Sequence, residues 1–347
     1  MLLNPDHPIE DILARDLLAL SEENKEQFIQ RAFIYWREKG FPYRDMSEKE
    51  IAHNFGKIGN SQSSAIIAGK RVIGSTIGLD LANSFHPQIW HAARWGHFKS
   101  PIDYFNDDDS LKKVLEKAIK LWPDRRCWSS YVIRSAFRIY SGGRVSNFRP
   151  TVSKAIFEQF STNGATVLDF CAGFGGRLLG ALALQRHYIG IDPSERQIDA
   201  NQQMYNAIQT YTKCTAEFLK GCAEEIMPQM ETSSVDMIFT SPPYFKQEKY
   251  NKELDQSYLR YKSYDDWKAK FLEQVIVESL RLLKTNGYFI INISNIRGYP
   301  LATDFEELAK KYFILRDIYE LDMTSRPAHR KNSATYKSEP VYIFQKV

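Results

Sequence analysis

The feature that most constrains the fold of this sequence is an alternation of short apolar runs with amphipathic segments that begins after Gly164. Strands that alternate with helices in this way indicate a parallel sheet with helices on its faces. We therefore predict an α/β fold with a Rossmann-like sheet, whose last two strands form an antiparallel pair at one edge. Seven strands are expected, at residues 165–169, 188–192, 216–219, 235–240, 288–293, 315–321 and 341–344.

The N-terminal part of the chain has a different character, mainly helical and basic. Helical spacing of apolar residues predicts helices over 9–20, 22–39 and 110–121. Residues 51–150 contain 15 basic and 7 acidic side chains, and 125–157 contains no acid. Such a surplus favours a polyanionic partner for residues 1–147, and the change of pattern sets residues 148–347 apart as a second region.

Composition excludes several classes of protein. With 43% apolar residues over 347 positions, the chain is expected to be globular rather than disordered. Every apolar run is shorter than the roughly 20 residues of a membrane span, and no signal peptide is evident, so a cytoplasmic protein without membrane association is expected. The four cysteines lack zinc-site spacing, which predicts reduced thiols and no bound metal.

A glycine-rich turn follows the first predicted strand. Asp169 ends that strand, and Gly173, Gly175 and Gly176 would let the backbone approach a ligand at the start of a helix. Asp192, 23 residues later at the end of the next strand, can accept hydrogen bonds from ribose hydroxyls. Both features also occur for structural reasons, as tight packing and helix capping, and a similar turn is found in dehydrogenases.

A second turn, Ser241-Pro242-Pro243-Tyr244-Phe245, directly follows the strand at 235–240. Consecutive prolines remove backbone donors and leave carbonyls as acceptors. An exocyclic amine could donate to Ser241 and to the Pro242 carbonyl while its ring stacks on Tyr244. Phe245 or Tyr250 would help to close the pocket. The alternative is a rigid turn with a packed tyrosine.

These motifs resemble those of the AdoMet-dependent DNA amino-methyltransferases, over about residues 150–347. The resemblance assigns catalysis to Ser241, Pro242, Pro243 and Tyr244. It assigns cofactor binding to Thr151, Lys154, Asp169, Cys171, Ala172, Gly173, Gly175, Asp192, Cys222 and Ala223. Two positions depart from the family, because Cys171 replaces the usual Phe and Cys222 occupies a slot where an Asp near the adenine is common.

The resemblance implies a site-specific DNA methyltransferase that uses S-adenosyl-L-methionine and flips its target base out of double-stranded DNA. It implies that residues 148–347 form the catalytic domain, which leaves the recognition of the DNA target to residues 1–147. A serine in the catalytic motif is similar to cytosine-N4 enzymes, and adenine N6 is the alternative. An RNA base amino-methyltransferase and a non-catalytic nucleic-acid-binding protein stay open, as does a cognate restriction or defence protein as partner. The basic residues expected to contact nucleic acid are Arg125, Arg126, Arg134, Arg138, Arg144, Lys246 and Lys249.

Overall fold

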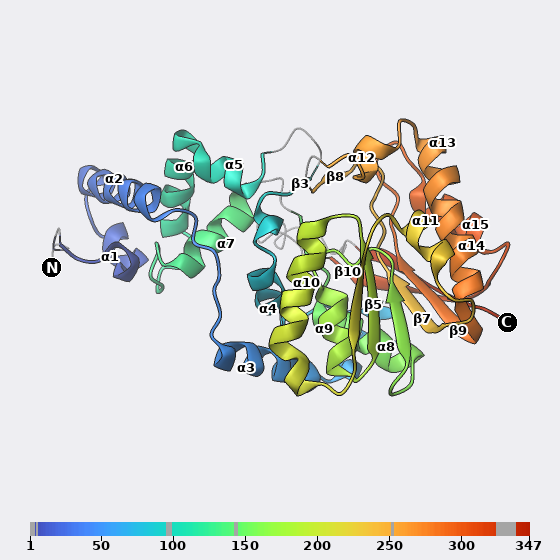
Figure 1. The fold of residues 1–347 in the computed structure, drawn as a ribbon. Helices are drawn as coiled ribbons and strands as arrows, with labels where there is room; N and C mark the ends of the chain where they lie inside the picture. The colour runs from blue at the N-terminus through green and yellow to red at the C-terminus, as the bar shows by residue number, and fades with distance from the viewer. Residues whose placement is uncertain (1–3, 5, 95–98, 142–144, 251–252, 324–337) are drawn as a thin grey trace. The chain divides into compact units, whose positions relative to one another are not determined.

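The computed structural model describes residues 4, 6–94, 99–141, 145–250, 253–323 and 338–347 (Figure 1). The chain divides into two compact units: Met1–Asp45 with Trp90–Val145, and Met46–Ile89 with Ser146–Val347. This division differs from the single boundary after residue 147 that the sequence suggests. The difference arises because the segment Met46–Ile89 packs into the second unit.

The first unit is helical around its own core. Trp36, Trp128 and Phe137 are fully buried there. Helix α2 has the predicted bounds, since Ser21 caps its first turn by accepting from the Asn24 amide and Gly40 ends it at a φ of +83°. The single helix expected over 9–20 is instead a 3-10 turn followed by a short helix. The elements of this unit are η1 (Ile9–Asp11), α1 (Ala14–Leu18), α2 (Glu22–Lys39), β3 (Ala93–Arg94), α5 (Pro101–Asn106), α6 (Asp108–Ile119) and α7 (Ser130–Tyr140), with η3 (Pro87–Trp90) at the boundary.

The second unit is built on a nine-stranded sheet of order β1-β2-β10-β11-β9-β7-β4-β5-β6. All seven predicted strands are present, and β10 and β11 pair antiparallel as expected. The additional strands β1 and β2 extend the sheet beyond β10. The strands of this unit are β1 (Ile67–Ala68), β2 (Arg71–Val72), β4 (Thr166–Asp169), β5 (His187–Asp192), β6 (Ala216–Lys220), β7 (Val235–Thr240), β8 (Glu248–Lys249), β9 (Leu283–Asn292), β10 (Ile314–Asp322) and β11 (Ser338–Gln345), of which β8 lies outside this sheet.

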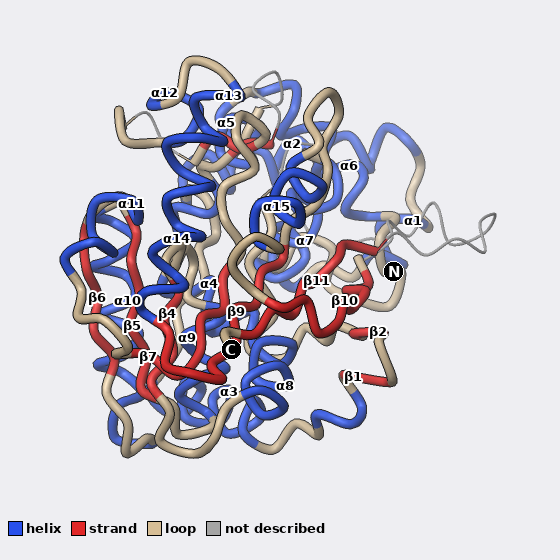
Figure 2. Tube along the Cα trace, turned by 90° about the vertical axis from the view of Figure 1, so that its right-hand side faces the viewer, coloured by secondary structure: helices blue, strands red, loops and turns tan. Residues whose placement is uncertain are grey.

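Helices cover both faces of the sheet (Figure 2). Neighbouring residues of one strand point to opposite faces, so Val167 and Met237 join one apolar core and Leu168 and Ile238 join the other. The helical elements are α3 (Glu48–Gly59), η2 (Ser63–Ala65), α4 (Leu79–Phe85), α8 (Pro150–Phe160), α9 (Gly176–Ala183), α10 (Glu195–Ile208), η4 (Gln209–Tyr211), α11 (Ala223–Ile226), η5 (Met227–Gln229), α12 (Ser257–Arg260), α13 (Tyr264–Trp267), the π-helical turn Lys268–Leu272, α14 (Glu273–Leu282) and α15 (Leu301–Ala309).

Met46–Ile89 belongs to this unit for identifiable physical reasons. Strand β2 pairs parallel to β10, and Arg71 forms an ion pair of 2.8 Å with Asp322. Ile58 and Leu81, both fully buried, pack in the same core as α8 and α9. The segment therefore extends the sheet through β2 and shares a core with helices α8 and α9.

The four strands β4, β5, β6 and β7 run parallel, as does β9 beside β7. Their carboxyl ends consequently meet at one edge of the sheet, which is where ligands bind in open α/β sheets. Within the described part of the chain, no helix is long and apolar enough to cross a membrane.

Candidate active site

The glycine turn connects β4 to α9 and requires glycine for two distinct reasons. Gly173 and Gly175 have φ values of +51° and +70°, a region that side chains disfavour. A Cβ on Gly175 would also lie 2.3 Å from Met204 Cε and 2.4 Å from Asn201 Oδ1. Asn201 holds the turn from α10 by donating to the Gly173 carbonyl at 3.0 Å. The turn is thus a fixed stretch of bare backbone at the carboxyl edge of the sheet.

Asp169 is fully buried and accepts four hydrogen bonds. One carboxylate oxygen receives Arg177 Nε at 2.6 Å and the Tyr188 hydroxyl at 2.7 Å. The other receives the Thr240 hydroxyl at 2.8 Å and the Cys171 amide at 3.3 Å. Because a carboxylate has about four acceptor positions, Asp169 has little capacity left for a ligand. Its placement indicates that it positions the strand ends around the site, in contrast to the direct cofactor contact expected from the sequence.

Asp192 ends the neighbouring strand β5 and is only partly committed. Its Oδ2 accepts from the Gly173 amide at 2.9 Å and its Oδ1 from the Ser194 amide at 3.0 Å. Each oxygen keeps a second acceptor position, which suits the two hydroxyls of a ribose. Burial raises the pKa of Asp192 to about 6.

Four further residues that the resemblance assigns to the cofactor follow strands β4 and β6: Cys171, Ala172, Cys222 and Ala223. The Ala172 amide donates to the Ile191 carbonyl at 2.9 Å, which joins the glycine turn to β5. After β6, Cys222 precedes α11, and its Sγ lies 3.9 Å from the Asp255 carbonyl, while Ala223 is buried. Burial raises the pKa of the Cys222 thiol to about 12, so this thiol is neutral. Burial likewise raises the pKa of the Cys171 thiol well above its usual value.

The expected catalytic turn, Ser241-Pro242-Pro243-Tyr244, follows β7. Its backbone is fixed by a 2.9 Å bond from the Phe245 amide to the Pro243 carbonyl, with Phe245 at a φ of +52°. Among the described residues, none donates a hydrogen bond to the Ser241 hydroxyl or to the Pro242 carbonyl, and Ser241 is half-buried. These two acceptors therefore lack a donor within the described part of the chain.

Three aromatic side chains around this turn take different positions. Tyr244 is buried, with its hydroxyl 3.5 Å from the Asn292 carbonyl. Phe245 points into the core and packs against Tyr264 and Tyr299, so it does not close a pocket. The ring of Tyr250 lies 5.9 Å from that of Phe174, so Tyr250 flanks the glycine turn.

Thr151 and Lys154 on α8 have partners that differ from the expected cofactor contact. The Thr151 hydroxyl lies 3.0 Å from that of Ser75. The buried Lys154 ammonium donates to the Ser61 carbonyl at 2.9 Å and pairs with Glu158 at 3.3 Å. Both side chains are held by the segment Met46–Ile89 or by their own helix, an arrangement that the local motif does not reveal.

The basic residues expected to bind nucleic acid differ in their availability. Arg126 pairs with Asp11 at 2.8 Å, Arg134 donates to the Pro42 carbonyl at 2.9 Å, and Arg138 lies 5.1 Å from the ring of Trp90. Arg125 is exposed, 5.5 Å from the ring centres of Trp122 and Tyr131.

In the second unit, Lys246 donates to the Lys262 carbonyl at 3.1 Å, and Lys249 lies 5.3 Å from the Tyr258 ring. Both lysines are exposed. Arg144 lies outside the described residues.

Several residues of the site could not be recognised from the sequence. Asn147 donates to the Phe174 carbonyl at 2.8 Å, and Asn201, Arg177 and Tyr188 act as described above. Arg177, Tyr188 and Asn201 lie within helices or strands, and Asn147 lies in the loop before α8. At such positions a polar residue carries no indication of its partner.

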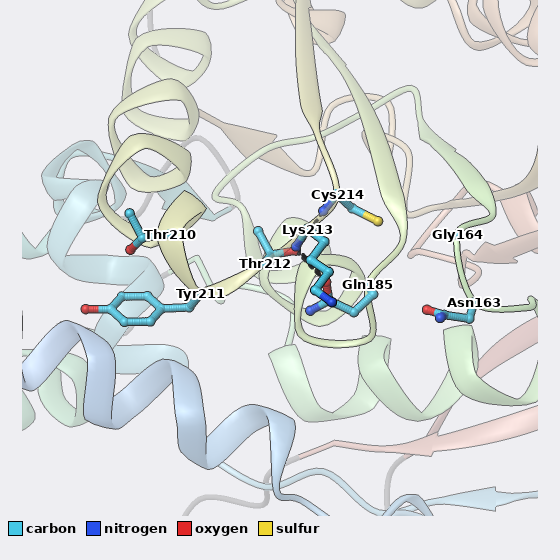
Figure 3. Close-up of a pocket in the computed structure, with 8 residues that line it drawn as sticks. All are labelled: Asn163, Gly164, Gln185, Thr210, Tyr211, Thr212, Lys213 and Cys214. Atoms are coloured by element: carbon cyan, nitrogen blue, oxygen red, sulfur yellow. Dashed lines mark hydrogen bonds between the residues drawn. The ribbon is translucent and has the colours of Figure 1, made fainter.

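A separate hollow of about 440 Å³ lies at the opposite edge of the sheet (Figure 3). It is lined by Asn163, Gly164, Gln185, Thr210, Tyr211, Thr212, Lys213 and Cys214. Asn163 precedes β4 and Gln185 precedes β5, so the hollow faces the amino ends of the strands. It contains none of the predicted site residues. Among the described residues, no group of three potential metal ligands comes together.

Two known families match parts of the chain. Residues 235–347 match the N6/N4 methyltransferase family described as DNA methylase, and residues 139–261 match the family described as conserved hypothetical protein 95. The chain is an AdoMet-dependent methyltransferase. Within that class, residues 235–347 resemble the DNA methylases, a resemblance that covers about a third of the chain.

Solved structures give weaker similarities. TrmN from Thermus thermophilus is 15% identical with a TM-score of 0.41, over 57% of this chain and 49% of that chain, so the match spans about half of TrmN. A TehB-like SAM-dependent methyltransferase from Corynebacterium glutamicum is 17% identical with a TM-score of 0.36, over 58% of this chain and 90% of that chain. A SAM-dependent O-methyltransferase from Thermotoga maritima is 14% identical with a TM-score of 0.39, over 59% and 68%. Comparison with curated proteins gives no significant match.

Proposed function

We propose that this enzyme methylates the exocyclic amine of a base in double-stranded DNA, in the cytoplasm, with cytosine N4 preferred over adenine N6. The observation that carries the proposal is the pair of acceptors without donors, Ser241 Oγ and the Pro242 carbonyl. They directly follow Thr240, whose hydroxyl is bonded to Asp169 at the start of the glycine turn. An amine bound there would lie beside the cofactor turn. The match of residues 235–347 to DNA methylases supports DNA as the polymer.

The residues present fit S-adenosyl-L-methionine. The bare backbone at Gly173 and Gly175 provides close approach, and Asp192 keeps acceptor positions for ribose hydroxyls. When bound, the cofactor supplies an electrophilic methyl group. Asp169, Arg177 and Asn201 hold the turn in place but do not contact the reacting atoms in this scheme.

The catalytic turn would orient the amine and needs no strong base. Ser241 Oγ and the Pro242 carbonyl accept the two N–H groups, which directs the nitrogen lone pair out of conjugation with the ring. The amine proton becomes acidic only as the new N–C bond forms, so a hydroxyl and a carbonyl suffice as acceptors. The serine in place of a carboxylate is the basis for preferring cytosine N4.

An amine inside a duplex is stacked and paired, so the target base must flip out to reach Ser241. Contacts with phosphates by exposed cations such as Arg125 and Lys249 would hold the duplex and make its affinity depend on salt. We assign target recognition to the helical first unit. A cognate restriction or defence protein has no support in the structure.

The test is mass spectrometry of nucleosides from DNA of cells that express the wild type, Ser241→Ala or Ser64→Ala. Ser64 is exposed, has no hydrogen-bond partner among the described residues and serves as the matched control. We expect N4-methylcytosine with the wild type and Ser64→Ala, and a loss of at least about 100-fold with Ser241→Ala, by analogy with loss of a transition-state hydrogen bond.

The other results of this experiment each select an alternative. N6-methyladenine in place of N4-methylcytosine would move the enzyme to the adenine class. If neither nucleoside appears although the purified protein binds S-adenosyl-L-homocysteine, DNA is the wrong substrate and RNA amines are tested next. Absence of cofactor binding would favour a non-catalytic nucleic-acid-binding protein.

A further inference from the structure

Asp255 carries a buried acceptor for which the protein supplies no donor. It lies directly before Gln256 and α12, in the segment that follows the catalytic turn. Its Oδ1 is buried and has no hydrogen-bond partner among the described residues. An unsatisfied buried carboxylate oxygen is costly and rare in folded proteins. A donor on a bound ligand would remove this cost.

Backbone contacts place Asp255 beside the cofactor side of the site. Its carbonyl accepts from Cys222 Sγ at 3.9 Å. Gly221, which directly precedes Cys222, donates its amide to the Asp192 carbonyl at 3.1 Å. Asp255 and the proposed ribose carboxylate are therefore linked through two consecutive residues, Gly221 and Cys222. The charge of Asp255 also contributes, after burial, to the raised pKa of Asp192, which is consistent with this proximity.

The segment that carries Asp255 is anchored at its C-terminal side. Arg260 Nε pairs with Glu224 at 2.9 Å, and the same guanidinium also pairs with Glu225. The Tyr261 hydroxyl donates to Glu224 as well. Because Glu224 and Glu225 belong to α11, directly after Cys222, these bonds fasten α12 to α11 and hold Asp255 at Cys222.

The donors of an adenosyl group are the two ribose hydroxyls and the exocyclic amine of adenine. Asp192, at the end of β5, is suited to the hydroxyls. Cys222 follows the neighbouring strand β6, so a base attached to that ribose would extend towards Cys222. The Cys222 thiol is directed to the Asp255 carbonyl and is a weak acceptor, so it cannot satisfy the amine.

We propose that Asp255 accepts the exocyclic amine of the cofactor's adenine and so selects adenosyl over other nucleosides, an inference that rests on the cofactor site described above. Asp255 would bind the amine although it lies 33 residues after Cys222 in the sequence. Its Oδ1 then has a donor in the bound state, which accounts for the buried unsatisfied oxygen.

Calorimetric titration with S-adenosyl-L-homocysteine and S-inosyl-L-homocysteine tests this proposal, because the second ligand carries a carbonyl oxygen where the first has its amine. The wild type should bind the adenosyl ligand at least about tenfold more tightly, as one buried hydrogen bond and one avoided oxygen–oxygen repulsion predict. Asp255→Ala should weaken adenosyl binding about tenfold and not inosyl binding, so that the preference disappears. Asp255→Asn can donate to the inosyl oxygen and should shift the preference towards that ligand.

Glu253→Ala is the matched control, since it removes a carboxylate from the same segment. Its preference for the adenosyl over the inosyl ligand should equal that of the wild type. An unchanged ratio of the two affinities in both Asp255 variants would overturn the proposal, even if both affinities fell, because a common fall reports a general disturbance. Failure of the wild type to bind either ligand would overturn the cofactor site and the proposal with it. Neither result depends on DNA. If DNA is the wrong polymer, the titrations will still give the expected affinities, but no methylated nucleosides will appear in the cellular DNA.

Discussion

Thr240 Oγ1 donates a 2.8 Å hydrogen bond to Asp169 Oδ1 and thereby joins the last residue of β7 to the last residue of β4. Ser241 follows one partner of this bond and the glycine turn follows the other. The two turns, which cooperate in methyl transfer under the proposed function, are thus connected by a buried polar contact. Arg177 and Tyr188 hold the second oxygen of the same carboxylate.

Replacing Thr240 by valine tests this connection. Thr240→Val keeps the shape of the side chain but removes a donor to a buried carboxylate, so we expect the free energy of unfolding to fall by about 1–3 kcal/mol. Urea unfolding measures this change. Thr303→Val is the control, because the exposed Thr303 hydroxyl only accepts from Asn295, and it should change stability by less than about 0.5 kcal/mol. Equal effects of the two substitutions would contradict a special role for the Thr240 bond.

Cofactor affinity should depend on pH through Asp192. Burial raises the pKa of this carboxyl from 3.8 to about 6, and ribose hydroxyls donate better to the ionised form. Binding of S-adenosyl-L-homocysteine should therefore weaken by up to about tenfold between pH 7 and pH 5. Calorimetry across this range checks the expectation. Asp192→Asn should bind the ligand more weakly than the wild type, and its affinity should not depend on pH in this range. A flat profile in the wild type would exclude Asp192 as the titrating group.

The same raised pKa has the opposite consequence for stability. The folded protein holds the Asp192 proton more tightly than the unfolded chain does, so the stability contributed by this group is present below about pH 4 and is lost as pH rises to about 6. Asp192→Asn should accordingly not lower the free energy of unfolding at pH 7, although it should lower the affinity for the cofactor. A large loss of stability in this variant at pH 7 would point to a structural role instead.

Gly175 and Gly164 form a matched pair for backbone strain. Their φ values are +70° and +76°, but a Cβ on Gly175 would clash with Asn201 and Met204, whereas one on Gly164 meets no atom within 4 Å. Gly164→Ala should cost about 1 kcal/mol from φ alone. Gly175→Ala should cost clearly more and also lower cofactor affinity, as thermal unfolding and calorimetry would show. Similar losses of stability in the two variants would mean that Asn201 and Met204 on α10 can move aside for the added carbon.

Arg125 is the described arginine of the basic segment that is best available to a phosphate. Removing one phosphate contact lowers the slope of log affinity against log salt by about 1, so Arg125→Ala should weaken binding to duplex DNA and flatten its salt dependence. Fluorescence anisotropy at several salt concentrations measures both. Arg316→Ala, an exposed arginine on β10 bonded to Gln345, is the control. An unchanged slope for Arg125→Ala would remove this residue from the proposed DNA surface.

Local signals in the sequence predicted much of the fold. Apolar runs identified the seven main strands, and Ser21 with Gly40 gave both ends of α2, because caps and strand periodicity depend on neighbouring residues only. The helix α7 was not predicted, since its arginines and aromatics were interpreted as a binding surface rather than as an amphipathic helix. The membership of Met46–Ile89 in the second unit depends on β2 pairing with β10, about 250 residues later in the chain, which no local pattern specifies.

The sequence by itself determined where the two candidate turns lie, because a glycine turn after one strand and Ser-Pro-Pro-Tyr after another must meet at the carboxyl edge of a parallel sheet. Tertiary structure alone decided which polar groups face that edge. It directed Lys154 to Ser61, surrounded Asp169 with four donors and left Asp255 Oδ1 without one. The physical reason is that hydrogen bonding and burial depend on partners brought together by packing, whereas turn geometry is a property of the local chain.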